Sequence, residues 1–277
     1  MNTRRPQTLL AAVFVGALAF ATGSIAARGQ VAATAATAEQ HKDGDSLSQA
    51  ASDPTASLMS VQIADWYGAR FHGLGDEDAN TVVLRSAIPF TTGDLKHIFR
   101  VTVPIISDHP SLDSGLSDIT LFDLVVFDQS WGRWGAGAVA LLPTGGSRRG
   151  TEQWALGPAV GFTSKNGKLL WGVFNQNLFT YAGDDGRTPV NASILQPIFN
   201  YGLGHGWSVG VSEMTFTYDW EAGRWSNLPL GVGVSKVQRF GKLPVQFNLQ
   251  YEHNFADERG DTADTIRFAM KFLFPTH

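Results

Sequence analysis

Apolar and polar residues alternate along this chain, and the alternation is clearest near its end. Within residues 264–274 the apolar face consists of Ile266, Phe268, Met270, Phe272 and Phe274. The residues between them are polar or small and include Arg267 and Lys271. Successive side chains of a β-strand point to opposite sides, so this period of two predicts a strand with one apolar and one polar face.

About twelve such segments follow one another from residue 60 onward, each bounded by Gly, Asn, Asp or Pro. They are residues 60–70, 80–90, 97–106, 118–127, 134–142, 152–163, 169–180, 191–202, 207–218, 227–239, 243–253 and 264–274. None of these segments has a convincing helical period. The expected fold class is therefore all-β and antiparallel.

Two architectures fit this alternation, and the lengths of the connections distinguish them. A soluble sandwich turns its apolar faces inward, whereas a transmembrane barrel turns them toward lipid and joins its strands by long exterior loops and short periplasmic turns. The long connections, which are also acidic and Gly-rich, are residues 72–79, 107–117, 143–151, 181–190, 219–226 and 254–263. They follow the odd-numbered segments. The sequence thus predicts a monomeric up-and-down transmembrane β-barrel of about twelve strands, with these loops at the cell exterior.

Aromatic residues gather at the ends of the expected strands. They are Trp131, Trp134, Trp154, Tyr181, Trp207, Tyr218, Trp220, Trp225 and Phe274. Amphipathic rings at these positions are typical of the aromatic girdles at the two lipid interfaces of a barrel. The alternative is that Trp and Tyr are simply good strand residues. The last strand also resembles the terminal signal that barrel-assembly machinery recognises, although Pro275 to His277 extend beyond it.

The first residues have the composition of a secretory signal peptide. Arg4 and Arg5 form a basic start, residues 9–21 an apolar core, and residues 24–26 a small-x-small cleavage site. An uncleaved anchor is the alternative, but the apolar stretch is short for a membrane span. We therefore expect a signal peptide at 1–26, a flexible linker at 27–56 and an outer-membrane barrel at 57–277. The expected location is the outer membrane of a Gram-negative cell.

The expected linker is rich in Ala, Thr, Ser and Gln, and residues 28–57 contain no aromatic residue. Such a segment cannot bury a core of its own. Two alternatives stay open for it. Its alanines can form a short helix, and Asp53 to Leu58 can enter the barrel as a plug instead of leading in from the periplasm.

Composition narrows the possible functions. Charged residues make up 17% of the chain, and it contains 30 glycines, 8 tryptophans and no cysteine. An ordinary hydrophobic share of 43% does not fit a bundle of spanning helices, which needs long apolar runs. A net charge of −4 gives no basic patch for nucleic acid, and the lack of cysteine rules out disulfides and thiolate metal sites. We expect no cofactor and no nucleic-acid partner.

Six short motifs follow one another along the expected barrel. They are Leu141-Leu142-Pro143-Thr144-Gly145, Leu156-Gly157-Pro158, Gly183-Asp184-Asp185, Leu195-Gln196-Pro197, Thr217-Tyr218-Asp219-Trp220 and Phe272-Leu273-Phe274-Pro275. Their order and spacing as a set resemble the meta-pathway phenol-degradation family of transporter-like outer-membrane proteins. The resemblance covers most of the span from residue 53 to residue 275. It implies a barrel with a transport role, and members of the family are often encoded near genes for the breakdown of aromatic compounds. The resemblance implies no catalytic residues for this chain.

If the apolar faces point to lipid, the opposite faces line a lumen with charges of both signs. The expected lumen residues are Arg85, Arg100, Asp123, Glu213, Asp219, Gln246, Asn248, Gln250, Glu252, Arg267 and Lys271. Opposed charges can orient a polar solute in a narrow pore. They can equally satisfy one another in a plugged lumen.

The sequence predicts a channel for passive uptake of small solutes, hydrophobic or aromatic ones among them. The expected partners are that solute, the lipid and lipopolysaccharide of the outer membrane, and the barrel-assembly machinery. Arg148 and Arg149 are candidates for contacts with lipopolysaccharide phosphates. A plugged structural or adhesive barrel is the alternative.

An outer-membrane lipid hydrolase is the enzymatic alternative, and it needs a serine, a base and an acid on one wall. The candidate bases are His72, His97, His109, His205 and His253. None of them lies in a motif with a nearby serine on the same face. No spacing typical of a metal site appears either. We therefore expect no catalytic or metal-binding residues.

Overall fold

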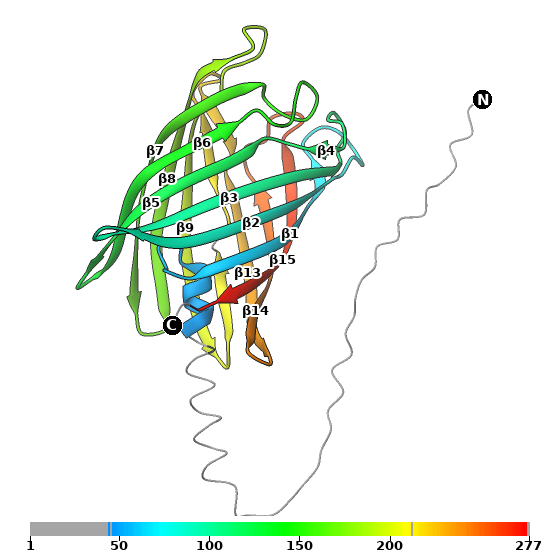
Figure 1. Ribbon diagram of the computed structural model, residues 1–277. Helices are drawn as coiled ribbons and strands as arrows, with labels where there is room; N and C mark the ends of the chain where they lie inside the picture. Colours follow the sequence, from blue (N-terminus) through cyan, green and yellow to red (C-terminus); the bar gives the residue numbers. More distant parts are fainter. Residues whose placement is uncertain (1–43, 45, 212, 276–277) are drawn as a thin grey trace, which may run out of the picture. The chain divides into compact units, whose positions relative to one another are not determined.

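A computed structural model describes residue 44, residues 46–211 and residues 213–275 (Figure 1). The expected signal peptide and residues 27–43 of the expected linker lie outside the described residues. The strands are β1 Met59–Phe71, β2 Ala79–Thr92, β3 Leu95–Asp108, β4 Gly115–Leu116, β5 Ile119–Gln129, β6 Gly132–Leu142, β7 Gln153–Asn166, β8 Leu169–Gly183, β9 Asn191–Gly204, β10 Trp207–Val211, β11 Phe216–Asp219, β12 Arg224–Asn227, β13 Pro229–Phe240, β14 Leu243–Asn254 and β15 Thr262–Phe274.

These strands close into one antiparallel ring with twelve positions, which we call staves. Some staves consist of two strands in succession. β15 pairs with β1, with Phe274 opposite Met59, and neighbouring strands pair in chain order around the ring. β10 and β11 pair with successive parts of β9 and form one interrupted stave, and β12 and β13 lie in another. The pairing of β10 with both β9 and β13 closes the ring. The predicted closed barrel of twelve strands is confirmed.

The two ends of the barrel differ in their connections. Two-residue turns occupy residues 93–94, 130–131, 167–168, 205–206 and 241–242. The connections at the other end are residues 72–78, 109–118, 143–152, 184–190, 220–223 and 255–261. The expected asymmetry is present, and the turns are shorter than the sequence indicated. Tight turns of this kind are typical of the periplasmic end of an outer-membrane barrel.

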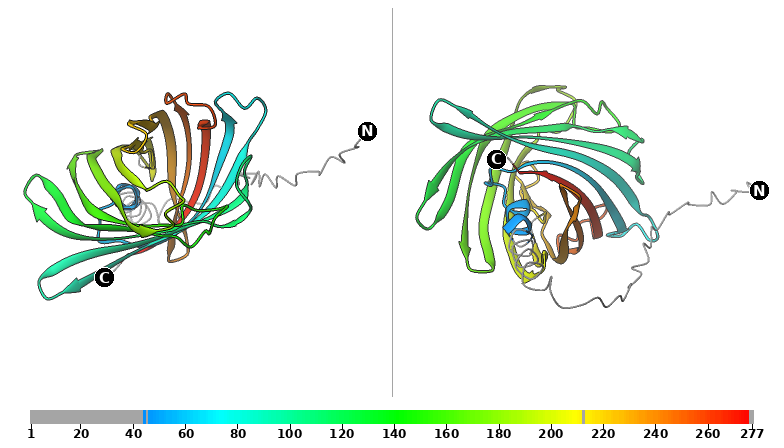
Figure 2. Two further views of the ribbon diagram at one scale, coloured as in Figure 1. Left: turned by 90° about the horizontal axis from the view of Figure 1, so that it is seen from above. Right: turned by 60° about the horizontal axis from the view of Figure 1, so that its bottom comes forward.

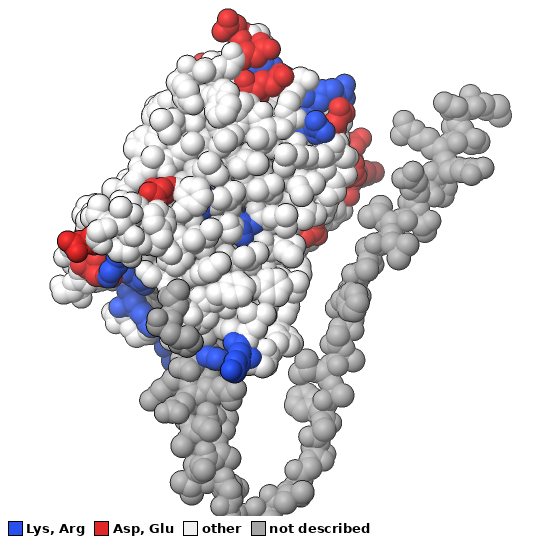
Figure 3. All heavy atoms as spheres, in the orientation of Figure 1, with Lys and Arg blue, Asp and Glu red and all other residues white. Residues whose placement is uncertain are grey.

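The outer face of the barrel carries the apolar residues. Ile63, Leu249 and Phe268 are 43%, 51% and 45% exposed, which a soluble sandwich would avoid. Figure 3 shows charged side chains gathered toward the two ends of the visible face, with few charges in the band between. Exposed Trp131 lies in the two-residue turn 130–131, and exposed Trp207 directly follows the turn 205–206. No helix in the described part of the chain has the length and hydropathy to cross a membrane.

The inner face is divided into an apolar wall and a polar wall. Side chains from β3 and β5 to β9 form a buried apolar cluster of Ile98, Phe122, Leu124, Val126, Val139, Ala155, Ala159, Leu170, Phe174, Leu178 and Ile198. The opposite wall, on β1, β14 and β15, contains buried Gln62, Gln246, Gln250 and Glu252. The barrel therefore encloses an amphipathic interior.

An N-terminal segment of residues 44–58 lies inside the ring of strands. Residues 44–52 form a helix with residue 45 undescribed, and a turn at residues 54–56 leads toward β1 (Figure 2). Residues 51–56 are all buried. The loose linker expected up to residue 56 is thus ordered from residue 44 onward, because the barrel supplies the apolar and polar partners that the segment lacks by itself. This arrangement agrees with the plug and helix alternatives.

Candidate functional site in the barrel lumen

A buried ion pair fixes the turn of the N-terminal segment to the wall. Arg133 Nη2 donates to Asp53 Oδ2 at 2.6 Å, and the Asp53 side chain is only 2% exposed. Asp53 Oδ1 accepts from the backbone N–H of Thr55 at 2.8 Å and from its hydroxyl at 2.6 Å. Arg133 Nη1 donates to the Thr55 carbonyl at 3.1 Å. We call this pair of Asp53 and Arg133 the latch.

The helix of the segment is held by further polar contacts. The hydroxyls of Ser48 and Ser208 lie 3.0 Å apart, and both residues are buried. Lys271 Nζ donates to the Ala51 carbonyl at 2.8 Å, which places a cation at the C-terminal end of the helix. Apolar contact comes from a small cluster of Ala51, Ala56, Leu58, Val237 and Leu273. Side chains thus hold the segment near the end of the barrel that carries the two-residue turns.

A cationic cluster faces this segment from the wall. Arg85 Nη1 donates to Glu213 Oε2 at 2.5 Å, and Lys271 Nζ lies 3.8 Å from Glu213 Oε1. The Arg100 guanidinium lies over the Phe122 ring at 4.4 Å from its centroid. Glu213 lies between β10 and β11, where the stave is interrupted. The interruption brings an acid among three cations.

A second group of paired charges lies farther along the polar wall. Arg267 Nη2 donates to Glu252 Oε2 at 3.1 Å, and the Glu252 side chain is 3% exposed. Gln250 donates a further hydrogen bond to Glu252. The guanidinium groups of Arg267 and Arg85 lie 4.4 Å and 5.9 Å from the centroid of Trp66. The charges of Arg267 and Glu252 thus compensate each other, although Arg267 Nε has no hydrogen-bond partner within the described structure.

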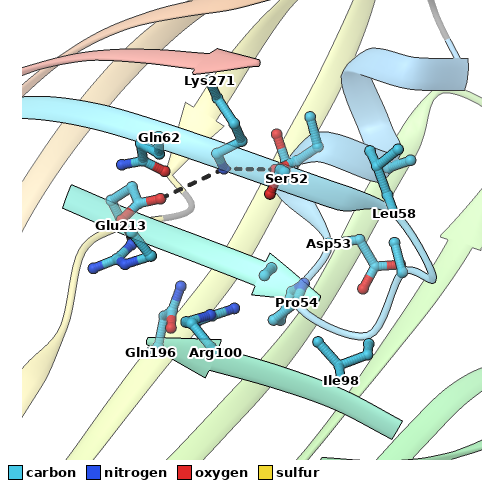
Figure 4. A pocket seen from close by; sticks show the side chains of 16 residues that line it. Ser52, Asp53, Pro54, Leu58, Gln62, Ile98, Arg100, Gln196, Glu213 and Lys271 are labelled. Carbon is cyan, nitrogen blue, oxygen red and sulfur yellow. Dashed lines mark hydrogen bonds and ion pairs between the residues drawn. The ribbon is translucent and has the colours of Figure 1, made fainter. Parts of the chain in front are cut away.

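Little open space is left between the segment and the wall. A cavity of about 50 Å³ lies there, between residues 50–58 and the cationic cluster (Figure 4). Gln62, Arg85, Arg100, Glu213 and Lys271 are among its lining residues. A water molecule needs about 10–15 Å³ of such space, so the cavity has room for only a few. The segment and the side chains of the cationic cluster thus enclose a small, mainly polar space.

Nine of the expected lumen residues lie on the inner face. They are Arg85, Arg100, Glu213, Gln246, Asn248, Gln250, Glu252, Arg267 and Lys271. Gln246 donates to the Ser48 carbonyl at 3.4 Å and Asn248 to the Ser235 hydroxyl at 2.8 Å. The structure therefore brings these side chains onto the inner face, where Gln246 and Lys271 contact the N-terminal segment.

The other two expected lumen residues lie elsewhere. Asp123 is on the outer face, because its neighbour Phe122 is part of the inner apolar cluster. There Asp123 Oδ2 accepts a hydrogen bond from His97 Nδ1 at 2.9 Å. Asp219 ends β11 and accepts hydrogen bonds from two backbone amides of the following turn, at 2.9 Å and 3.0 Å. Its role in the structure is to stabilise that exterior turn.

Several residues at this site were not singled out by the sequence. Gln62, Trp66, Arg133 and Thr163 all lie on the inner face, and Thr163 Oγ1 is 2.8 Å from the hydroxyl of Thr55. The alternation could have assigned Gln62 and Trp66 inward, since they fall between exposed Val61, Ile63 and Tyr67. No sequence signal pairs Arg133 with Asp53, eighty residues away.

Three of the candidate histidines, His97, His109 and His253, lack the full set of partners of a hydrolase triad in their described contacts. His97 and His253 each contact a carboxylate, at 2.9 Å to Asp123 and 2.8 Å to Asp264. The hydroxyl within reach of His109 is that of Ser111 at 3.3 Å, in an exterior connection. None of these three histidines has both partners. Within the described ranges no group of His, Cys, Asp and Glu is arranged to hold a metal ion.

Comparisons with solved structures agree with the barrel architecture. The COG4313 outer-membrane channel from Pseudomonas putida F1 superposes with a TM-score of 0.56 at 13% identity, covering 80% of this chain and 97% of that chain. The chain shares the fold of outer-membrane β-barrels. The NanC porin covers 79% of this chain and all of its own, at 9% identity and a TM-score of 0.49. Outer membrane phospholipase A from Escherichia coli covers 78% and 92%, at 12% identity and a TM-score of 0.40.

Neither a family model nor a curated protein matches the chain. The resemblance to the meta-pathway phenol-degradation family therefore stays a prediction.

Proposed function

We propose that this chain is an outer-membrane channel for small solutes, and that the segment of residues 44–58 closes it from the periplasmic end. The observation that carries the proposal is the way this segment is seated. It lies inside a complete barrel and is held there by the latch, by hydroxyl contacts and by one lysine. A barrel with such an insert has a closed state that can be released.

The segment can leave without disturbing the wall. In the described part of the chain, residues 44–58 pair with no strand, and the backbone hydrogen bonds of residues 50–58 are local, from Asp53 to Ala50 and from Ala56 to Asp53. The twelve staves keep every ladder hydrogen bond when the segment departs. Only side-chain contacts must break, and each contributes about 0.5–3 kcal/mol.

The division of the interior supports a solute with an apolar body and a polar group. One wall is built from Phe122, Phe174 and other apolar side chains, and the facing wall from amides and charges. Small aromatic compounds have this character, and they are the solutes that the resemblance to the meta-pathway phenol-degradation family implies. The COG4313 channel that shares the fold is named as an outer-membrane channel.

The exterior loops fit a lipopolysaccharide environment. Arg148 is 69% exposed in the connection 143–152 and pairs with Asp113 at 2.8 Å. Guanidinium groups at this level can bind lipopolysaccharide phosphates. Insertion of the chain would require the barrel-assembly machinery, for which the strand β15 is a suitable signal.

The proposal is tested by planar-bilayer recording of the purified full chain and of a variant lacking residues 44–57. Heat-modifiable gel mobility first establishes that both are folded barrels. We expect rare, small current steps from the full chain and larger, long-lived steps from the variant, because its insert is removed. If both preparations are heat-modifiable and neither conducts, the chain is not a channel.

A plugged structural barrel is the second candidate, and the small space beside the segment favours it. The cavity there, of about 50 Å³, has room for a group of only a few atoms while the segment is seated. The same recordings separate the two functions. A structural barrel stays silent in both forms because its apolar and polar walls close the lumen without the segment.

A further inference from the structure

The cavity between the N-terminal segment and the barrel wall carries an excess of positive charge. Its lining contains the cations Arg85, Arg100 and Lys271 and the acids Asp53 and Glu213 (Figure 4). Asp53 is already paired in the latch, and Glu213 is shared by Arg85 and Lys271. Arg100 has no ion pair of its own among the described residues. Three cations thus share the single charge of Glu213, and two positive charges at this cavity lack a counter-charge.

The same cavity is lined by polar atoms without hydrogen-bond partners. Gln62 is 2% exposed, and neither its Oε1 nor its Nε2 atom has a partner within the described structure. Arg100 Nε is a further buried donor without a partner. Buried polar groups in folded proteins are normally satisfied, so orphaned atoms at a cavity indicate an absent ligand or water. Two of these three atoms are hydrogen-bond donors, which favours a ligand that accepts hydrogen bonds.

Size and shape limit what this acceptor can be. A volume of about 50 Å³ holds a group of a few heavy atoms, and Pro54, Ala87 and Ile98 supply apolar lining beside the polar groups. A metal or ammonium cation would be repelled by the three positive side chains. A neutral solute would leave the Arg100 charge without compensation in a medium of low dielectric constant, which is costly. A carboxylate satisfies the charge and accepts from both orphaned donors.

We propose that this cavity is a binding site for the carboxylate group of a small organic acid. The guanidinium of Arg100 compensates the charge, the Gln62 amide donates a hydrogen bond, and the apolar lining accommodates a short substituent. As a statement about which solute is carried, this inference rests on the proposed channel function. Binding itself requires no conduction and is tested separately.

The test uses chloride as a small-anion probe and acetate as a competitor on the full chain in detergent. The protein broadens the chlorine-35 resonance when chloride exchanges with the cavity, and acetate removes this excess line width. Arg100→Gln removes the charge, and Gln62→Met removes the neutral donor at similar size. We expect each to weaken acetate competition about tenfold or more, because a hydrogen bond to a charged group is lost.

Arg187→Gln is the matched control, because it removes an arginine that lies in an exterior connection and is 40% exposed. It should leave the acetate-sensitive line width unchanged. Gln62→Met distinguishes a specific site from a generally positive lumen, since it changes no charge. If wild-type protein gives no acetate-sensitive broadening, or if both cavity variants behave like the control, the cavity holds water only and the proposal is overturned.

Planar-bilayer recordings of the same preparations separate this inference from the channel proposal. Acetate-sensitive broadening without conductance retains the site and removes the channel. Conductance without acetate-sensitive broadening retains the channel and removes the site.

Discussion

The latch offers the sharpest test of how the lumen is closed. We consider Arg133→Gln, which removes the cation that compensates the Asp53 carboxylate. Breaking a fully buried pair costs about 3–5 kcal/mol, because the remaining charge stays desolvated. Asp53 is 2% exposed but Arg133 is 32% exposed, so water takes over part of the role of the guanidinium. We therefore expect a cost of about 2 kcal/mol.

This cost falls on the seated state alone. When the segment leaves the lumen, Asp53 becomes hydrated and no longer needs Arg133. A change of about 2 kcal/mol then shifts the ratio of open to closed barrels about 30-fold. Single-channel recording measures this ratio as the open probability at a fixed voltage. Arg187→Gln, at an exterior pair with a separation of 3.4 Å and an arginine that is 40% exposed, is the control and should leave the ratio unchanged.

A second substitution tests whether the uncompensated charge of Asp53 causes the shift in open probability. Asp53→Asn in the Arg133→Gln background removes the uncompensated charge and keeps a side chain that can accept from Thr55. We expect the double variant to return most of the way to the wild-type open probability. An open probability of Arg133→Gln within twofold of wild type, in folded protein, would refute the assignment of the latch as the closing contact.

Three further predictions concern the stability of the barrel. Asp123→Leu should raise the free energy of unfolding in lipid vesicles by about 1 kcal/mol, because a carboxylate on the outer face is costly beside lipid; a loss of stability in urea titrations would contradict its outward placement. Arg267→Met should lower that free energy by about 3 kcal/mol, because Glu252 is 3% exposed and loses its ion pair. Tryptophan fluorescence during urea unfolding measures this loss, and an unchanged midpoint would show that the pair contributes nothing. Gly137→Ala should lower the stability of the barrel by about 2 kcal/mol or more, because the added Cβ would lie 1.9 Å from the Asp123 carbonyl oxygen. The heat-modifiable form should therefore be lost at a lower temperature than in wild type. Wild-type heat resistance would argue against this close approach.

The sequence predicted the polar wall well and the apolar wall poorly. In β14 and β15 one face is apolar and the other polar, so the period of two alone decides which side chains share the lumen. In β5 both faces are apolar, with Phe122 and Leu124 inward and Leu121 and Val125 on the opposite face. Alternation then does not show which face of the strand points inward, and Asp123 was predicted on the wrong face. The reason is physical, since that part of the lumen is filled by an apolar cluster instead of water.

The N-terminal segment shows the same limit. Its composition excludes a core of its own, so the sequence predicts a loose linker and leaves a plug as the alternative. Burial of Asp53 and Thr55 depends on Arg133 and Thr163, which lie on β6 and β7 and contact them only after the ring has closed. No local pattern encodes a contact across eighty residues.

The sequence by itself determined the class of this protein, the number of its strands and the difference between its two ends. These follow from local rules, because side-chain alternation and turn residues act within a few positions of the chain. The tertiary structure alone decided which residues meet in the lumen. Ring closure places Arg85 beside Glu213, 128 positions later, and Asp53 beside Arg133, and it leaves Arg100 and Gln62 facing a small cavity. Those meetings depend on the register of twelve staves and on a segment folded into their centre, and both exist only in the closed barrel.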